Sequence, residues 1–171
     1  MKESLKSCAI TLGLTLWLTL QAAALLAQPA TQGMNELPIH DAARIGGQKE
    51  VELLLRATPQ NRDIRTPLGA TPLHYAAMNV SSGPLKALLA AGANPNARDN
   101  DGRTPLHMAA FSTRKDNTIL LLQAGSDPTL KTNDGRDVLS LARKVRADEI
   151  AGEISLWILK GCEAGKPVKG C

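Results

Sequence analysis

The chain has 171 residues, of which 43% are hydrophobic and only 2% aromatic, and its formal net charge is +4 at pH 7. This length fits a single domain with a packed core. The mild positive charge does not by itself indicate nucleic-acid binding, and the shortage of aromatic side chains removes the stacking surfaces on which single-stranded nucleic acids bind.

Residues 1–27 have the three-part pattern of a secretory signal peptide. Lys2 and Lys6 supply the basic start, residues 9–20 are apolar with interspersed threonine, and small residues follow. The pattern predicts cleavage after Ala27.

An uncleaved membrane anchor is the alternative for this segment. A helix needs about 20 apolar residues to span a bilayer, and residues 9–27 nearly supply them. Under both interpretations the two lysines hold the N-terminus in the cytoplasm. A short linker over residues 28–34 and all that follows are therefore predicted to be periplasmic or secreted, with membrane contact only if the segment stays uncleaved.

Beyond the linker, one motif recurs at a fixed spacing. His40, His74, His107 and Ser140 take corresponding places, at intervals of 34, 33 and 33 residues. A motif repeated in this way indicates a structural building unit, because a catalytic motif is normally written once. The repetition divides this part of the chain into units of about 35–69, 70–102, 103–135 and 136–160.

The start of each central unit predicts a helix. Thr71 and Thr104 are suited to cap free backbone N–H groups, and Pro72 and Pro105 follow at the first helical position, where a missing N–H costs nothing. The leucine and the alanine pair that come next lie at helical spacing and form one apolar face.

A second helix and a turn complete the pattern. The second helices are predicted over 50–57, 85–91 and 118–124, and Gly92 and Gly125 lie just past two of them, where glycine commonly ends a helix. The sequence Asn-Asp-Gly before the third and fourth units predicts tight turns.

Two helices and a protruding turn per 33 residues, with Thr-Pro-Leu-His at the start, closely resemble the ankyrin repeat. The resemblance covers about residues 35–160. It implies an all-α solenoid of about four helix-turn-helix units with protruding β-turn loops. The first and fourth units depart from the motif, with Leu37 in place of the capping threonine and Ser140 in place of the histidine. Such departures are typical of terminal repeats, which cover an exposed core.

The three histidines do not predict a metal site. Equivalent positions in stacked repeats lie about 8–10 Å apart, whereas zinc ligands lie about 2 Å from the metal. In the family that the chain resembles, this histidine braces the turn. The residues predicted to have structural roles are Thr71, Pro72, His74, Thr104, Pro105 and His107.

The sequence contains no nucleophile elbow, phosphate-binding loop or Cys/His dyad. We therefore expect no enzymatic activity, no cofactor, no bound metal and no small-molecule substrate.

Residues 161–171 form a tail with two cysteines, Cys162 and Cys171. Exported proteins commonly pair their cysteines, so a disulfide is predicted. Two thiols with no histidine nearby make an incomplete zinc site, and no base that would activate a catalytic thiol lies near them.

Binding is the remaining function class. Ankyrin repeats bind through turn tips and the exposed face of the first helix, and the resemblance implies contacts at the turn residues flanking glycine and just after the alanine pair. The predicted contacts are Arg44, Ile45, Arg65, Leu68, Met78, Asn79, Arg98, Asn100, Asp101, Arg103, Phe111, Ser112, Lys131, Asn133, Asp134, Arg136 and Lys144. Seven of them are basic and two acidic, which predicts a partner protein with an acidic surface. The alternative is a solvated face whose charges maintain solubility.

The sequence thus predicts an exported, monomeric and non-catalytic module that binds another protein and no nucleic acid. An adaptor or assembly factor for an envelope protein is the first interpretation. An immunity or inhibitor protein that blocks a toxin or an envelope enzyme is the alternative.

Overall fold

The computed structural model describes residues 37–162. The predicted signal peptide, the linker and Cys171 lie outside these residues. The described part contains eight α-helices and no strand: α2 (Pro38–Ile45), α3 (Gln48–Ala57), α4 (Pro72–Met78), α5 (Gly83–Ala90), α6 (Pro105–Phe111), α7 (Lys115–Gln123), α8 (Val138–Lys144) and α9 (Asp148–Leu159). A short 3-10 helix over Pro59–Asp63 follows α3. The all-α repeat solenoid predicted from the sequence is confirmed.

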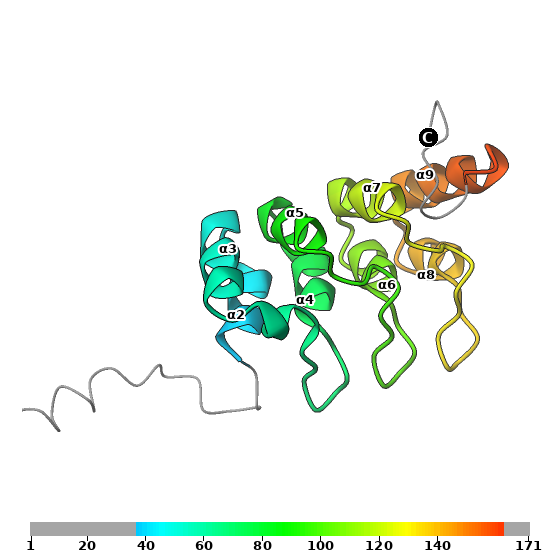
Figure 1. The fold of residues 1–171 in the computed structure, drawn as a ribbon. Coiled ribbons are helices and arrows are strands. Elements are labelled where there is room, and N and C mark those ends of the chain that lie inside the picture. Colours follow the sequence, from blue (N-terminus) through cyan, green and yellow to red (C-terminus); the bar gives the residue numbers. More distant parts are fainter. Residues whose placement is uncertain (1–36, 163–171) are drawn as a thin grey trace, which may run out of the picture. The chain divides into compact units, whose positions relative to one another are not determined.

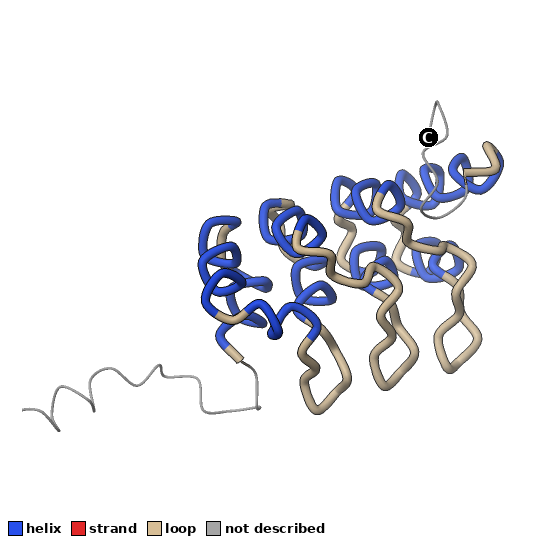
Figure 2. Tube along the Cα trace, in the orientation of Figure 1, coloured by secondary structure: helices blue, strands red, loops and turns tan. Residues whose placement is uncertain are grey.

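The helices form two rows (Figure 1). The first helices of the four units, α2, α4, α6 and α8, lie side by side in an inner row, and α4 packs against both α2 and α6. The second helices, α3, α5, α7 and α9, form the outer row. Three long loops project from the inner row in one direction (Figure 2).

Buried leucine and alanine side chains hold the inner row together. Leu73 and Leu106, with the alanine pairs that follow them, have no exposed surface. Alanine leaves room for a close helix neighbour, so the same short side chains that make each helix apolar on one face also set the tight spacing of the stack. The predicted apolar face is therefore the buried one.

The second helices begin two or three residues earlier than predicted. The structure starts α5 at Gly83 and α7 at Lys115. The sequence estimate used the apolar run, which marks only the buried turns, whereas the first turn of each helix carries polar or small residues. The predicted C-terminal glycines are confirmed: Gly92 and Gly125 have positive φ angles of 81° and 94°, a conformation that glycine adopts without a steric penalty.

Polar side chains cover the C-terminal end of the stack. Arg143 and Lys144 stand on α8 where α6 has Ala110 and Phe111, and both are exposed. Asp137 caps α8 by accepting a hydrogen bond of 2.7 Å from the Ser140 amide. This agrees with the terminal-repeat role predicted for the fourth unit. Within residues 37–162, no helix is both long and apolar enough to cross a bilayer.

Candidate functional site

The three projecting loops, here called the finger loops, span residues 65–70, 98–103 and 131–136 (Figure 2). Each closes on itself through backbone hydrogen bonds. In the second loop the Asp99 amide donates to the Arg103 carbonyl at 2.9 Å and the Gly102 amide donates to the Asp99 carbonyl at 3.0 Å. The positive φ of 76° at Gly102 makes this turn possible, as the Asn-Asp-Gly sequence predicted.

An asparagine joins each finger loop to the one before it. The Asn100 amide donates to the Leu68 carbonyl at 3.0 Å, and its side-chain Nδ2 donates to the Pro67 carbonyl at 2.9 Å. Asn133 repeats this pattern toward the second loop, with Nδ2 2.8 Å from the Asn100 carbonyl. The loops are therefore bonded into one row, and two predicted contact residues spend their amides on that row.

The sequence carries a signal for this row that the motif analysis missed. Asn100 and Asn133 recur at a spacing of 33 residues, directly before Asp-Gly, and Pro67 takes their place in the first loop. No finger loop precedes the first one in the described structure, so a residue without an N–H is tolerated there.

Histidines fasten the finger loops to the inner helices. The backbone N–H groups of Thr71 and Thr104 donate to Nδ1 of His74 and His107 at 3.1 and 3.2 Å. Because Nδ1 accepts, the neutral ring carries its proton on Nε2. Nε2 of His74 then donates to the Arg103 carbonyl at 3.1 Å.

The predicted threonine caps act differently from the expectation. The hydroxyl groups of Thr71 and Thr104 each lie 2.9 Å from Nδ1 of the histidine, and neither serves as a side-chain cap of the helix amides. The buried histidine ring is the nearer partner, which explains why threonine and histidine recur together.

His107 differs from the other two histidines at its second nitrogen. Nε2 of His40 lies 3.2 Å from the Ile64 carbonyl, and His74 has its bond to Arg103. Nε2 of His107 is buried and forms no hydrogen bond within the described structure. The Arg136 carbonyl is near enough to favour the charged ring, but it does not complete the bond.

Ion pairs occupy two of the predicted contact arginines. Nε of Arg103 lies 2.9 Å from Asp99 and Nη2 lies 2.5 Å from Asp101, while Arg136 pairs with Asp134. These are charges within one finger loop that balance each other. Arg98 and Lys131 form no ion pair with any carboxylate of residues 37–162, so the unpaired positive charge lies at the start of each finger loop rather than at its end.

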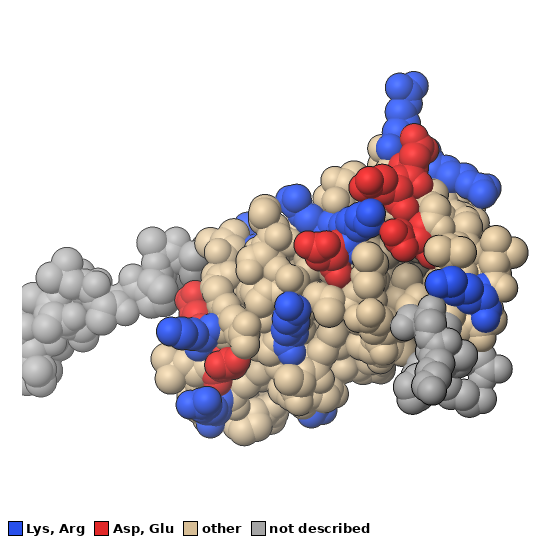
Figure 3. Space-filling view, turned by 90° about the horizontal axis from the view of Figure 1, so that it is seen from above, with Lys and Arg blue, Asp and Glu red and all other residues tan. Residues whose placement is uncertain are grey.

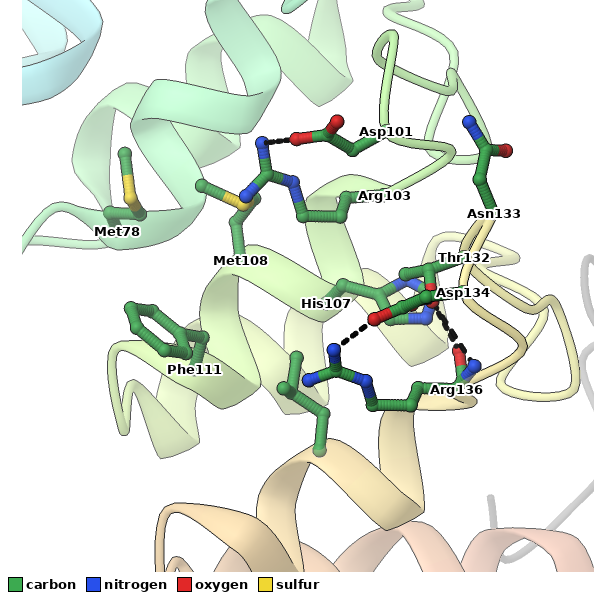
Figure 4. A pocket seen from close by; sticks show the side chains of 11 residues that line it. Met78, Asp101, Arg103, His107, Met108, Phe111, Thr132, Asn133, Asp134 and Arg136 are labelled. Atoms are coloured by element: carbon green, nitrogen blue, oxygen red, sulfur yellow. Dashed lines mark hydrogen bonds and ion pairs between the residues drawn. The ribbon is translucent and has the colours of Figure 1, made fainter.

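A cavity of about 440 Å³ opens between the last two finger loops and the inner helices (Figure 4). Met78, Met108, Phe111 and Leu141 form its apolar wall. The opposite wall carries the paired arginines of the finger loops, and His107 lies at its base. A smaller cavity of about 210 Å³ lies beside Leu68 and Tyr75 in the preceding repeat.

A family model of ankyrin repeats, in three copies, matches residues 39–132. The chain belongs to the ankyrin repeat family. No curated protein gives a match to the chain. The match covers the first three ankyrin units, and the helix pair α8–α9 adds a fourth whose motif is too altered to extend it. Ankyrin repeats are in general protein–protein interaction modules without catalytic activity.

The ankyrin surface brings most of the predicted contacts together, but not all. Phe111 and Leu68 are 57% and 62% exposed beside the two cavities, and Met78 lines both. Arg44 forms an ion pair of 2.7 Å with Asp41 on its own helix. Ile45 is 76% exposed at the end of α2 and lines neither cavity.

Asn79 is the predicted contact that the structure places elsewhere. It is buried, and its Nδ2 donates to the Ala43 and Gly46 carbonyls at 3.0 and 3.2 Å. Asn117, at the start of α7, does the same for the end of α4, with Nδ2 2.9 Å from the Asn79 carbonyl. Both asparagines satisfy helix C-terminal carbonyl groups across a repeat boundary, so Asn79 stabilises the stack and its amide is unavailable to a partner.

The outer face of the ankyrin stack has a different character. Figure 3 shows acidic and basic side chains mixed over it, with the acidic ones gathered toward α9. Lys115 of α7 lies 3.8 and 3.5 Å from Glu149 and Glu153 of α9. Among residues 37–162, no group of three histidine, cysteine, aspartate or glutamate side chains is arranged to hold a metal ion. Cys162 is buried, and its pairing with Cys171 stays a prediction because Cys171 lies outside the described residues.

Burial predicts how the stability of this ankyrin domain depends on pH. Desolvation lowers the pKa of His74 and of His107 below the ordinary value of 6.5. The unfolded chain therefore binds protons first as the pH falls, and stability is lost progressively below about pH 6.5. We expect the urea midpoint to be lower at pH 5 than at pH 7.

A variant separates this effect from other titrations. Glutamine at the third helical position can still bond the N-cap amide but does not titrate, so His74→Gln should weaken the dependence between pH 7 and 5. Asp134 and Asp137 do not interfere, because hydrogen bonds from Thr132 and Ser140 hold their pKa values below 3.8. An equal pH dependence in wild type and variant would contradict a role for His74.

Proposed function

We propose that this chain is an exported interaction module that binds a partner protein through the finger loops and the exposed face of the inner helices. One observation carries the proposal: a row of loops held rigid by asparagine and histidine hydrogen bonds stands over an exposed apolar surface of Met78, Met108 and Phe111. A rigid surface loses little conformational entropy on binding. Interface centres favour methionine, aromatic residues and arginine, which are the residues found here.

The partner that we propose has an acidic surface. Arg103 and Arg136 contribute little to this, since their charges are balanced inside the finger loops. Arg98 and Lys131, with no carboxylate partner in the described part of the chain, support it instead. Opposite charge across an interface accelerates association more than it strengthens the final complex.

Export is the second part of the proposal, and it rests on the sequence of residues 1–27 alone. We expect the mature protein to begin at Gln28 or within a few residues of it. Intact-mass measurement of protein recovered from the periplasm of an expressing bacterium tests this expectation. A full-length species that fractionates with the membrane would contradict cleavage.

Affinity capture from envelope extract tests the binding role. The mature chain serves as bait, beside a variant with Arg98→Glu and Lys131→Glu and a control with Lys49→Glu and Lys86→Glu, which reverses two exposed lysines on α3 and α5 of the outer row. We expect one protein to be retained by the wild type and the control but lost from the finger-loop variant. Retention by all three baits would contradict the charge assignment. If the retained protein is an enzyme, its activity in the complex distinguishes an adaptor from an inhibitor.

A further inference from the structure

The cavity beneath the last finger loop holds a polar group that the protein itself leaves unsatisfied. His107 has no exposed surface, and its Nδ1 is occupied by the Thr104 amide. The proton of the neutral ring therefore lies on Nε2, which is buried and without a hydrogen bond in the described structure. Buried N–H groups are nearly always paired, so an occupant of this cavity that offers an acceptor would be favoured.

The walls of the cavity indicate what else the occupant carries. Met78 and Met108 bring two thioether groups, and Phe111 brings a ring, across from the guanidinium groups of Arg103 and Arg136 (Figure 4). Thioethers, rings and guanidinium groups each interact favourably with an aromatic ring. Because the two arginines already pair with aspartates, a negative charge is not required of the occupant.

We propose that this cavity binds a tyrosine side chain of the partner protein, with the ring between Met78, Met108 and Phe111 and the hydroxyl oxygen accepting from Nε2 of His107. Tyrosine combines in one side chain an apolar ring and an oxygen that both donates and accepts. Phenylalanine fills the same space but leaves Nε2 without a partner. Large aromatic side chains in pockets commonly dominate the energy of an interface.

This inference rests on the proposed function, because it names the residue by which the partner is recognised. It also explains a difference between repeats. In the first two units the equivalent nitrogen donates to the carbonyl of the following loop, which closes the space below that loop. In the third unit the bond to the Arg136 carbonyl is missing, and the larger cavity lies at this place.

Small phenols test the cavity without the partner. The probes are p-cresol, which reproduces the tyrosine side chain, and toluene, which lacks the hydroxyl. The mature chain is labelled with ¹³C at the methionine methyl groups, so that Met78 and Met108 report from the cavity wall and Met34 reports from outside it. We expect p-cresol to shift the signals of Met78 and Met108 saturably and to move the Nε2 proton of His107 downfield. Toluene should bind about fivefold more weakly, the factor typical of one neutral hydrogen bond.

Two variants complete the test. Phe111→Ala removes part of the wall and should weaken p-cresol binding, whereas Val80→Ala changes an 82% exposed apolar residue that does not line the cavity and should leave binding unchanged. Equal binding of p-cresol and toluene, or a His107 proton that does not move, would overturn the tyrosine assignment. Absence of saturable shifts with both probes would overturn the site itself. Neither result touches the proposed function, which is tested separately by loss of the partner from the Arg98 and Lys131 variant.

Discussion

Replacing Leu106 by alanine is expected to lower the free energy of unfolding by about 2–5 kcal/mol. The side chain has no exposed surface, and α6, which carries it, packs between α4 and α8 in the middle of the array. Truncation removes buried apolar contacts and leaves a cavity that stacked helices on both sides cannot close. Because each repeat is stabilised by its neighbours, the loss should lower the stability of the whole domain. Urea denaturation followed by circular dichroism measures it.

Phe111→Ala is the matched control for this experiment. Phe111 stands on the same helix but is 57% exposed, and surface substitutions usually change stability by no more than about 0.5 kcal/mol. If both variants lose the same stability, the assignment of the buried face of α6 is wrong.

Gly102→Ala is expected to be the second most damaging substitution. A Cβ at Gly102 would lie 2.4 Å from Oδ1 of Asn133, 2.5 Å from Nη2 of Arg98 and 2.9 Å from the backbone nitrogen of Asn133. The side chain of Arg98 can move away, but the Asn133 backbone is held by its hydrogen bond to the Asp101 carbonyl. The substitution therefore separates two finger loops in addition to straining a residue with a φ of 76°.

Gly135→Ala isolates the strain from the contact. Gly135 has nearly the same φ, 79°, but no atom lies within 4 Å of its would-be Cβ. Left-handed backbone costs a non-glycine residue roughly 1–2 kcal/mol, and this should be the whole effect at Gly135. At Gly102 we expect at least about 1 kcal/mol more, as overpacking usually costs. Equal losses of stability in the two variants would mean that the finger loops do not support one another.

Local sequence signals were sufficient for the fold. Thr-Pro-Leu-His and the alanine pair state the first helix, its start and its buried face within seven residues, and Gly92 and Gly125 mark the ends of second helices. These features depend on neighbours along the chain, so the 33-residue period was enough to assemble them. The helix starts were less certain, because exposed first turns carry no apolar pattern.

The candidate site was harder to predict, because its chemistry depends on pairs across loops and repeats. Arg103 was counted as a free cation, yet the finger loop folds it back onto Asp99, four residues earlier. Asn79 was expected on the surface, but it faces the end of α2, a helix of the preceding repeat. His107 has the same local sequence as His74, and only the placement of the last finger loop distinguishes their second nitrogens.

Isothermal titration of the captured partner into three forms of the mature chain tests the central claim most directly. The forms are the wild type, Phe111→Asp beside the cavity, and Leu53→Asp on α3 of the outer row, where an apolar side chain is 67% exposed. Both variants introduce one exposed carboxylate, so both should fold as the wild type does. We predict that Phe111→Asp weakens binding at least about tenfold, as loss of a central interface residue commonly does, while Leu53→Asp binds like the wild type. Unchanged affinity for Phe111→Asp, or a loss confined to Leu53→Asp, would contradict binding through the finger loops and inner helices.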